Sequence, residues 1–188
     1  MAKSKNASRA DNQHERLMII GWIIGFVDGE GCFSINFVKQ PQRKEKKRIR
    51  RGYKTGYQIA HEFAVVQGER SLPVLKKMKI FFKVGNIYIN RRHDNHKENL
   101  YRYSVVKRED LINVIIPFFQ KNKLKTSKYN DFNLFVKCMK LMQKGKHLTR
   151  KGAIQIALIS EKMNHQKSRT KIIRILRNQT SDSARARG

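Results

Sequence analysis

Two acidic residues, Asp28 and Glu30, follow an apolar stretch (residues 17–27) and stand in a turn punctuated by glycines. Carboxylates at the C-terminal end of a helix oppose the helix dipole, so they need a reason other than helix stability. Glycine recurs at Gly21, Gly25 and Gly29, which predicts a helix face without side chains that lets a second helix approach closely. Two such helices, packed together, would bring two acidic turns near each other. That arrangement suits the cutting of two nearby strands.

The nine residues 23–31, Ile-Ile-Gly-Phe-Val-Asp-Gly-Glu-Gly, resemble the signature of the LAGLIDADG homing endonucleases, in the branch whose chains carry one motif. In that family the last acid of the motif binds the catalytic metal, which the resemblance places at Glu30, with the Gly29 carbonyl as a second ligand. The expected cofactor is Mg²⁺, with other divalent cations as alternatives, because such ions take oxygen ligands and activate water. With so few protein ligands the scissile phosphate must complete the shell. The alternative is an ordinary buried helix with acids in its last turn.

The resemblance extends to two further residues. Residues 63–67 match the end of the family's second strand, and Gln67 falls where relatives carry a polar residue that orients catalytic waters. Residues 128–132 resemble a stretch that opens a late helix, and Lys128 aligns with a lysine thought to hold or polarise a water. In a chain this basic, a lysine is usually a surface group or a phosphate contact. Relatives often place another basic residue where Ser71 stands here, and Arg70 is its neighbour.

The hydrophobic pattern predicts the elements that position these residues. Apolar residues alternate over 32–38 and 58–65, which favours strands, and 84–90 with 100–106 predicts a hairpin. Helical spacing covers 71–82, 111–119, 132–142 and 149–163, although Pro117 is awkward in a helix. We therefore expect an α+β fold of order αββαββα, the LAGLIDADG fold with a curved antiparallel DNA-binding sheet. Residues 1–16 would be a basic extension, 17–166 the endonuclease domain, and 167–188 a basic, partly disordered tail.

The composition points independently to nucleic acid. The chain has 42 Lys and Arg against 14 Asp and Glu, a formal charge of +28 over 188 residues. Such a charge favours a polyanionic partner, and a hydrophobic content of 39% still permits a core. Cys32 and Cys138 form neither a metal-ligand pair nor a disulfide framework, and the longest apolar run is too short for a membrane span. We expect an intracellular protein with no membrane partner, in a bacterial cytoplasm or an organelle.

DNA recognition should come from the outward face of the sheet, since paired strands can read the major groove. These residues are inferred from alternation, and a slip of one residue would reverse them. The expected DNA-binding set comprises strand residues, a basic loop between the first two strands, and Arg70: Ser34, Asn36, Gln40, Arg43, Lys44, Lys46, Lys47, Arg48, Arg50, Arg51, Gln58, Glu62, Arg70, Tyr88, Asn90, Arg91 and Arg102. The basic loop would track phosphates or, without DNA, be a solvated loop.

The single motif implies two copies of the chain. Within the family, chains with one motif dimerise, so we expect a homodimer on a long pseudo-palindromic double-stranded DNA site. The predicted activity is Mg²⁺-dependent, site-specific cleavage of both strands, leaving short 3′ overhangs, in intron homing. One alternative is an RNA maturase that helps its host intron fold. A non-catalytic DNA-binding regulator is a weaker alternative, because it would not need Glu30.

Overall fold

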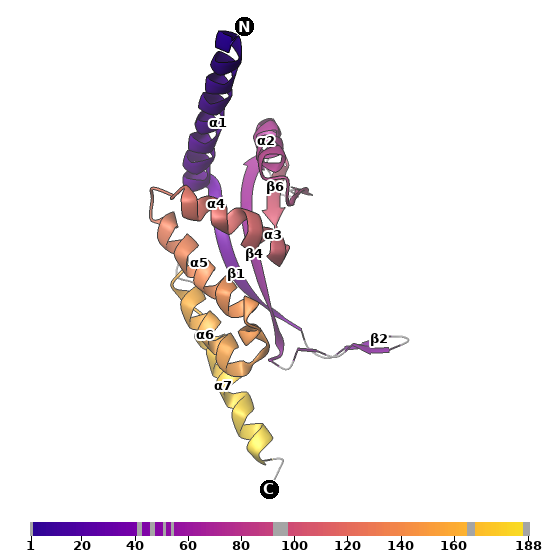
Figure 1. The fold of residues 1–188 in the computed structure, drawn as a ribbon. Coiled ribbons are helices and arrows are strands. Elements are labelled where there is room, and N and C mark those ends of the chain that lie inside the picture. The colour runs from indigo at the N-terminus through magenta and orange to yellow at the C-terminus, as the bar shows by residue number, and fades with distance from the viewer. Residues whose placement is uncertain are drawn as a thin grey trace. The chain divides into compact units, whose positions relative to one another are not determined.

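The computed structural model describes residues 2–40, 43–45, 48–50, 52–53, 55–91, 98–164 and 168–185. Residues 1–32 and 63–129 form one compact unit, and residues 33–62 and 130–188 form a second (Figure 1). The helices and strands, in chain order, are α1 (Ala2–Glu30), β1 (Gly31–Lys39), β2 (Arg43–Glu45), β3 (Arg48–Arg50), β4 (Tyr57–Gly68), α2 (Leu72–Phe82), β5 (Asn86–Asn90), β6 (Leu100–Val105), α3 (Arg108–Asp110), α4 (Ile116–Lys121), α5 (Lys128–Gln143), α6 (Arg150–Glu161) and α7 (Thr170–Arg185).

Four of the described strands pair in an antiparallel sheet. Its strand order is β1-β4-β6-β5, and β6 pairs antiparallel with both β4 and β5. Buried residues alternate with half-buried or exposed ones along β1, because Phe33 and Ile35 face the core while Cys32 and Asn36 face solvent. The predicted α+β class, the αββαββα order and both predicted strand pairs are confirmed.

The basic segment between β1 and β4 differs from the expected loop. Its described backbone forms a two-stranded antiparallel ribbon, in which Arg43 lies opposite Arg50 and Glu45 lies opposite Arg48 (Figure 1). Lys46, Lys47 and Arg51 lie outside the described residues. Alternation of apolar residues could not reveal this ribbon, since Ile49 is the one apolar residue between positions 43 and 51.

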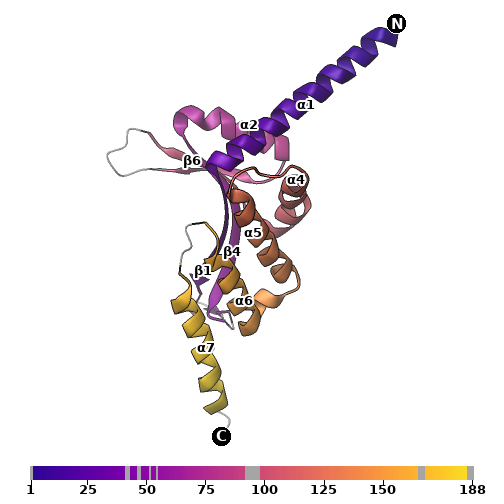
Figure 2. The same ribbon diagram turned by 90° about the vertical axis from the view of Figure 1, so that its left-hand side faces the viewer.

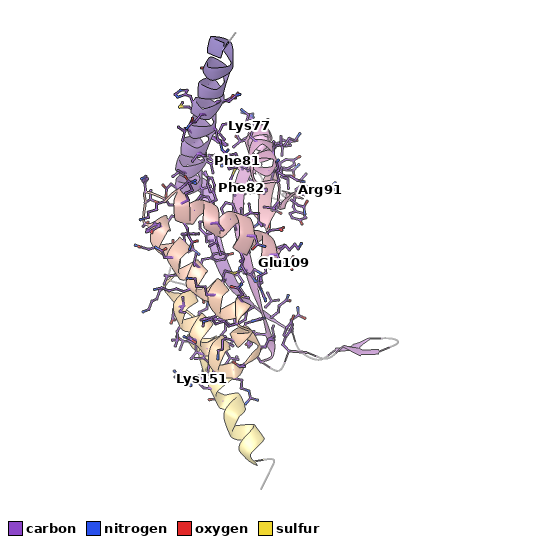
Figure 3. The ribbon with its side chains drawn as sticks, in the orientation of Figure 1. Lys77, Phe81, Phe82, Arg91, Glu109 and Lys151 are labelled. Atoms are coloured by element: carbon purple, nitrogen blue, oxygen red, sulfur yellow. The ribbon has the colours of Figure 1, made fainter. Side chains whose placement is uncertain are left out.

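The first unit has an aromatic core. The rings of Phe63 and Phe119 are 5.6 Å apart between centroids, those of Phe82 and Phe118 are 5.0 Å apart, and most of the pairs are edge-to-face. Helix α2, which carries Phe81 and Phe82 (labelled in Figure 3), packs on β5 and β6. Burial raises the pKa of the Tyr103 phenol, whose hydroxyl donates to the Val84 carbonyl at 2.8 Å.

Pro117 is accommodated by a local change of helix type. Residues Leu111–Ile115 form a π-helical turn between α3 and α4, and Pro117 stands in the first turn of α4. A proline at that point removes no hydrogen bond that the new helix needs. Pro117, which did not fit the predicted helix over 111–119, thus stands just after the junction between two helix types.

The second unit packs its helices on β1. Phe33 contacts Phe132 and Phe135 of α5, with ring centroids 5.1 and 5.5 Å apart. Helix α6 is capped by Thr149, whose side-chain oxygen accepts from the Gly152 amide at 3.1 Å, and α7 packs beside α6 (Figure 2).

The chain ends differ from the sequence prediction. Helix α7 spans much of the segment expected to be a partly disordered tail, and it buries Ile173 and Leu176. Helix α1 begins at Ala2, so its backbone runs through position 16 without a break. Among the described helices, none has an apolar stretch sufficient to cross a bilayer.

Candidate active site and nucleic-acid interface

The acidic turn lies where α1 becomes β1 with no intervening residue. Gly31 makes this junction possible, because a Cβ atom there would lie 2.5 Å from a Val27 methyl group and 2.8 Å from the Val27 carbonyl oxygen. Val27 is fully buried, whereas Glu30 is exposed. The motif therefore ends with its last carboxylate directed to solvent and its last glycine closed against the helix.

Asp28 is engaged by a loop that lies about a hundred residues further along the chain. Its carboxylate accepts from the Lys125 amide at 2.7 Å, the Thr126 amide at 3.2 Å and the Thr126 hydroxyl at 2.8 Å. These three donors explain why an acid is placed against the helix dipole. Of the two acids in the motif, Glu30 is the one left exposed.

Lys128, the first residue of α5, returns to the same turn. Its ammonium group donates to the Gly29 carbonyl at 3.2 Å and to the Gly31 carbonyl at 2.5 Å. These carbonyls belong to the residues on either side of Glu30, so the cation is held against the backbone of the turn that carries the exposed acid. The structure thereby brings together three predicted site residues, Gly29, Glu30 and Lys128.

The donor set suits a hard divalent cation only in part. The Glu30 carboxylate and the Gly29 carbonyl both offer oxygen, which such ions prefer. A carbonyl oxygen has two lone pairs, so the bond from Lys128 leaves Gly29 one further acceptor direction. Among the described residues there is no cluster of three or more His, Cys, Asp or Glu that could hold a metal. The residues fit an ion that takes its remaining ligands from elsewhere.

Gln67 and Arg70 lie near the end of β4. Gln67 is half-buried, and its partner across the ladder is Tyr101. Arg70 is exposed in the short 3-10 turn Glu69–Ser71, where its Nε lies 3.9 Å from a Glu98 carboxylate oxygen. Both belong to the same unit as Glu30 and Lys128.

The sheet register places the predicted residues of the later hairpin, Tyr88, Asn90 and Arg102, on one face of the sheet. Tyr88 lies directly opposite Arg102, and Arg102 lies opposite Val66. Asn90 is two residues from Tyr88 and therefore shares its face, while Tyr103 points to the core from the other face. Tyr88, Asn90 and Arg91 are exposed.

The strands of the second unit show a similar alternation. Asn36 and Gln58 are exposed, and Ser34, Gln40 and Glu62 are half-buried. The Asn36 amide lies 3.4 Å from the Ser34 hydroxyl, and the Gln40 amide lies 3.3 Å from the Gln58 carbonyl oxygen. For the basic ribbon, the described positions Arg43, Lys44, Arg48 and Arg50 are placed by their backbone alone.

Two residues that sequence reasoning missed hold β1 in place. The Asn164 side chain donates to the Phe33 carbonyl at 3.0 Å, and the Arg169 guanidinium donates to the Ile35 carbonyl at 2.9 Å. The same guanidinium stands 5.8 Å from the centre of the Phe37 ring. Because β1 is an edge strand, these side chains satisfy carbonyls that no neighbouring strand can bind. No motif signals them, since Arg169 lies in the expected tail.

Helix α1 carries a second, exposed apolar face. Leu17 and Met18 are 59% and 63% exposed, and Trp22 is 38% exposed, whereas Ile23 and Val27 on the opposite face are fully buried. At Gly21, Gly25 and Gly29, a Cβ atom would meet nothing within 4 Å. The predicted glycine face is thus open with respect to the part of the chain that the structure describes.

The comparison with protein families decides the assignment. The model of the LAGLIDADG endonuclease family matches residues 23–139, which include the motif, Gln67 and Lys128. The chain belongs to the LAGLIDADG endonuclease family. Its relatives include the probable intron-encoded endonuclease 2 of Neurospora crassa, 31% identical over 137 residues, or 72% of this chain and 25% of the relative. The probable intron-encoded DNA endonuclease 1 of Mycosarcoma maydis is 27% identical over 149 residues, covering 79% of this chain and 47% of the relative.

Solved LAGLIDADG structures share the fold. The homing endonuclease I-TnaI has a TM-score of 0.65 and 34% identity, over 85% of this chain and 96% of I-TnaI. I-SmaMI bound to cleaved DNA has a TM-score of 0.64 and 30% identity, over 79% of this chain and 44% of I-SmaMI. This chain therefore spans about a quarter of the length of the first Neurospora relative, and under half of I-SmaMI.

Proposed function

We propose that this LAGLIDADG chain is a site-specific DNA endonuclease that cuts both strands of a long site, as part of intron homing. The observation that carries the proposal is the corner formed by exposed Glu30, the Gly29 and Gly31 carbonyls and the Lys128 ammonium group. The intron-encoded endonucleases among its relatives and the DNA-bound I-SmaMI structure support it.

The corner supplies the elements of phosphodiester hydrolysis. Glu30 and the Gly29 carbonyl would hold a divalent cation, Mg²⁺ by preference, which neutralises phosphate charge and activates water. The Lys128 ammonium would hold a water or stabilise negative charge on the phosphate, since it is fixed at 2.5 Å from the Gly31 carbonyl. Gln67 would orient water. Substrate phosphate would supply the ligands that the chain lacks.

DNA reading would fall to the strands. Asn36 and Gln58 in the second unit, and Tyr88 and Arg102 in the first, present polar side chains from the outward face of paired strands. Arg102 is suited to guanine and Asn36 to adenine, because these side chains can bind those bases through two hydrogen bonds. The basic ribbon and Arg70 would contact phosphates and add salt-dependent affinity.

The test is cleavage of DNA that carries the intron-free form of the host gene, with Mg²⁺ and with EDTA. We expect discrete double-strand cuts with short 3′ overhangs, and Glu30→Gln should lower the rate by about 10³-fold, since a metal ligand is worth several kcal/mol. DNA binding, measured in Ca²⁺, should survive the substitution. No cutting by the unaltered protein would reject the endonuclease and leave the maturase ahead, which splicing of the host intron RNA would then test.

Two copies of the motif helix are required to cut two strands, and we propose that they come from two copies of this chain. The open glycine face and the exposed Leu17, Met18 and Trp22 provide the packing surface. The dimer would match a pseudo-palindromic site.

Gly25→Leu tests this interface without disturbing the single chain. A Cβ atom at Gly25 would meet nothing within 4 Å among the described residues, and leucine favours helix, so the monomer should fold normally. We expect light scattering to report a dimer for the unaltered protein and for Gly25→Ala a weaker one, but a monomer for Gly25→Leu. A dimer mass for Gly25→Leu would exclude this face.

A further inference from the structure

The geometry points to Asp28 as a positioning residue that fixes Lys128 beside Glu30, and we propose that cleavage depends on it. This inference rests on the proposed endonuclease function. It assigns to the first acid of the motif a role different from that of the second. The hydrogen bonds that support it form a closed circuit within one compact unit.

The circuit begins at the Asp28 carboxylate, which is half-buried. One oxygen accepts from the Lys125 amide at 2.7 Å, and the other accepts from the amide and the hydroxyl of Thr126 at 3.2 and 2.8 Å. Lys125 and Thr126 are both exposed, and they stand in the connection between α4 and α5. Leu124, in the same connection, is buried, so the carboxylate fixes the exposed part that follows it, Lys125 and Thr126.

The next step leads from Thr126 to Lys128. The Thr126 hydroxyl accepts from the Lys128 amide at 3.3 Å, and the Thr126 carbonyl accepts from the Tyr129 amide at 3.0 Å. Both bonds form at the start of α5 and set its first turn. The backbone of Lys128 is therefore placed by a residue that Asp28 holds.

The circuit closes on the motif itself. The Lys128 ammonium group donates to the Gly29 and Gly31 carbonyls, one residue on either side of Glu30. Asp28 is adjacent to Gly29, so the same turn of chain anchors both the loop and the tip of the lysine. Loss of the Asp28 bonds would release the loop at one end and let the ammonium group move away from Glu30.

Asp28→Asn is the direct test, because the amide keeps the shape of the side chain. Its NH₂ group would face amide donors, so it cannot accept from both Lys125 and Thr126. We expect the single-turnover cleavage rate at saturating DNA to fall by about tenfold or more, because small misplacements of catalytic groups are costly. The Kd for DNA in Ca²⁺ should change by less than twofold.

Glu109→Gln is the matched control. It removes the same charge from α3, where the Glu109 side chain is 74% exposed (labelled in Figure 3). It should cleave at the normal rate, which would separate the effect of Asp28 from that of net charge on DNA binding. Thr126→Val is the second variant, because it removes the hydroxyl and leaves both backbone bonds to Asp28. The cleavage rate of Thr126→Val should lie between those of Asp28→Asn and the unaltered protein.

A double-mutant cycle with Lys128→Met distinguishes positioning from general stability. If Asp28 acts through Lys128, the double variant should cleave no more slowly than Lys128→Met alone. If the fold-loss of cleavage rate in the double variant is the product of the two single losses, Asp28 acts by a route other than Lys128, and the proposal is wrong. A normal cleavage rate for Asp28→Asn would also overturn the proposal.

Hydrogen exchange without DNA keeps this inference separable from the proposed function. The exposed amides of Lys125 and Thr126 should be protected in the unaltered protein and should lose protection in Asp28→Asn, with no change in the amides of β6. If the amides of Lys125 and Thr126 are unprotected in the unaltered protein, the proposal that Asp28 holds this connection is overturned. If the unaltered protein binds DNA and does not cut it, the proposed endonuclease function fails. Hydrogen exchange still shows whether Asp28 holds Lys125 and Thr126.

Discussion

In the first unit, the side chains of Asp28 and Lys128 are fixed by hydrogen bonds to the backbone around the acidic turn, whereas in the second unit the side chains of Asn36 and Gln58 are exposed. Lys128 makes two hydrogen bonds to the turn and Asp28 accepts three. Around β1, the bonds from Asn164 and Arg169 also go to backbone carbonyls, but they fix the strand and leave the side chains of Asn36 and Gln58 accessible. Chemistry requires groups fixed before the substrate arrives, and base reading requires a rigid strand whose side chains are left for DNA.

Removal of the Lys128 ammonium should give the largest effect that separates the two regions. Lys128→Met should lower the single-turnover cleavage rate by about 10²-fold, as expected when a group that stabilises transition-state charge is lost, with little change in the Kd for DNA. Lys125→Met is its control, since it lies in the same loop and loses the same charge, and its backbone amide still binds Asp28. Equal losses for the two variants would show that the effect comes from net charge.

Truncation of a side chain expected to contact a base should have the opposite effect, a weaker Kd for DNA with little change in the cleavage rate. Asn36→Ala should weaken binding to the cognate DNA by about 5- to 150-fold, the range for one specific base contact, while the cleavage rate of the bound complex stays within twofold. Filter binding and single-turnover rates at saturating protein would measure the two effects. Asn113→Ala, at an exposed position on the π-helical turn, should change neither. A slower rate in the Asn36→Ala complex would show that the two regions are not separate in function.

Thiol labelling gives the smallest effect and requires no mutation. Burial raises the pKa of the Cys138 thiol to about 12, so at pH 8 only about one part in 10⁴ is thiolate, and it is shielded as well. Cys32 is exposed on the same face of β1 as Asn36. We expect one rapid label per chain, at Cys32, and slower labelling when cognate DNA is bound. Cys32→Ser should abolish the rapid reaction, and undiminished labelling on DNA would place the bases away from this face.

Patterns of short period could be predicted from the sequence, and contacts between distant segments could not. The alternation of Phe33 and Ile35 with Ser34 and Asn36 gave β1 the correct face, because burial on one side of a strand has a period of two. The nine-residue motif similarly predicted Glu30 at a helix end. The partners of Asp28 lie 97 and 98 residues away, and no local spacing encodes them. The placement of Asn164 and Arg169 on β1 likewise depends on where the chain turns after α6.

The type and extent of some helices could not be predicted from the sequence either. The π-helical turn before Pro117 and the helix α7 in a polar tail both depend on packing, which a propensity argument over a short window does not include. The roles of Gln67 and Arg70 stay predictions. Both lie in the same compact unit as Glu30.

The sequence distance between Glu30 and Lys128 has a consequence for the order of events during synthesis. The bonds that join the turn to Lys128 span 97 and 99 residues, so Glu30 leaves the ribosome long before its basic neighbour has been made. Contacts of such separation form late, after the intervening chain has folded. A nascent or truncated chain that ends before residue 125 would carry the acidic motif without its lysine. For the proposed endonuclease, cutting would therefore require synthesis to have passed Lys128.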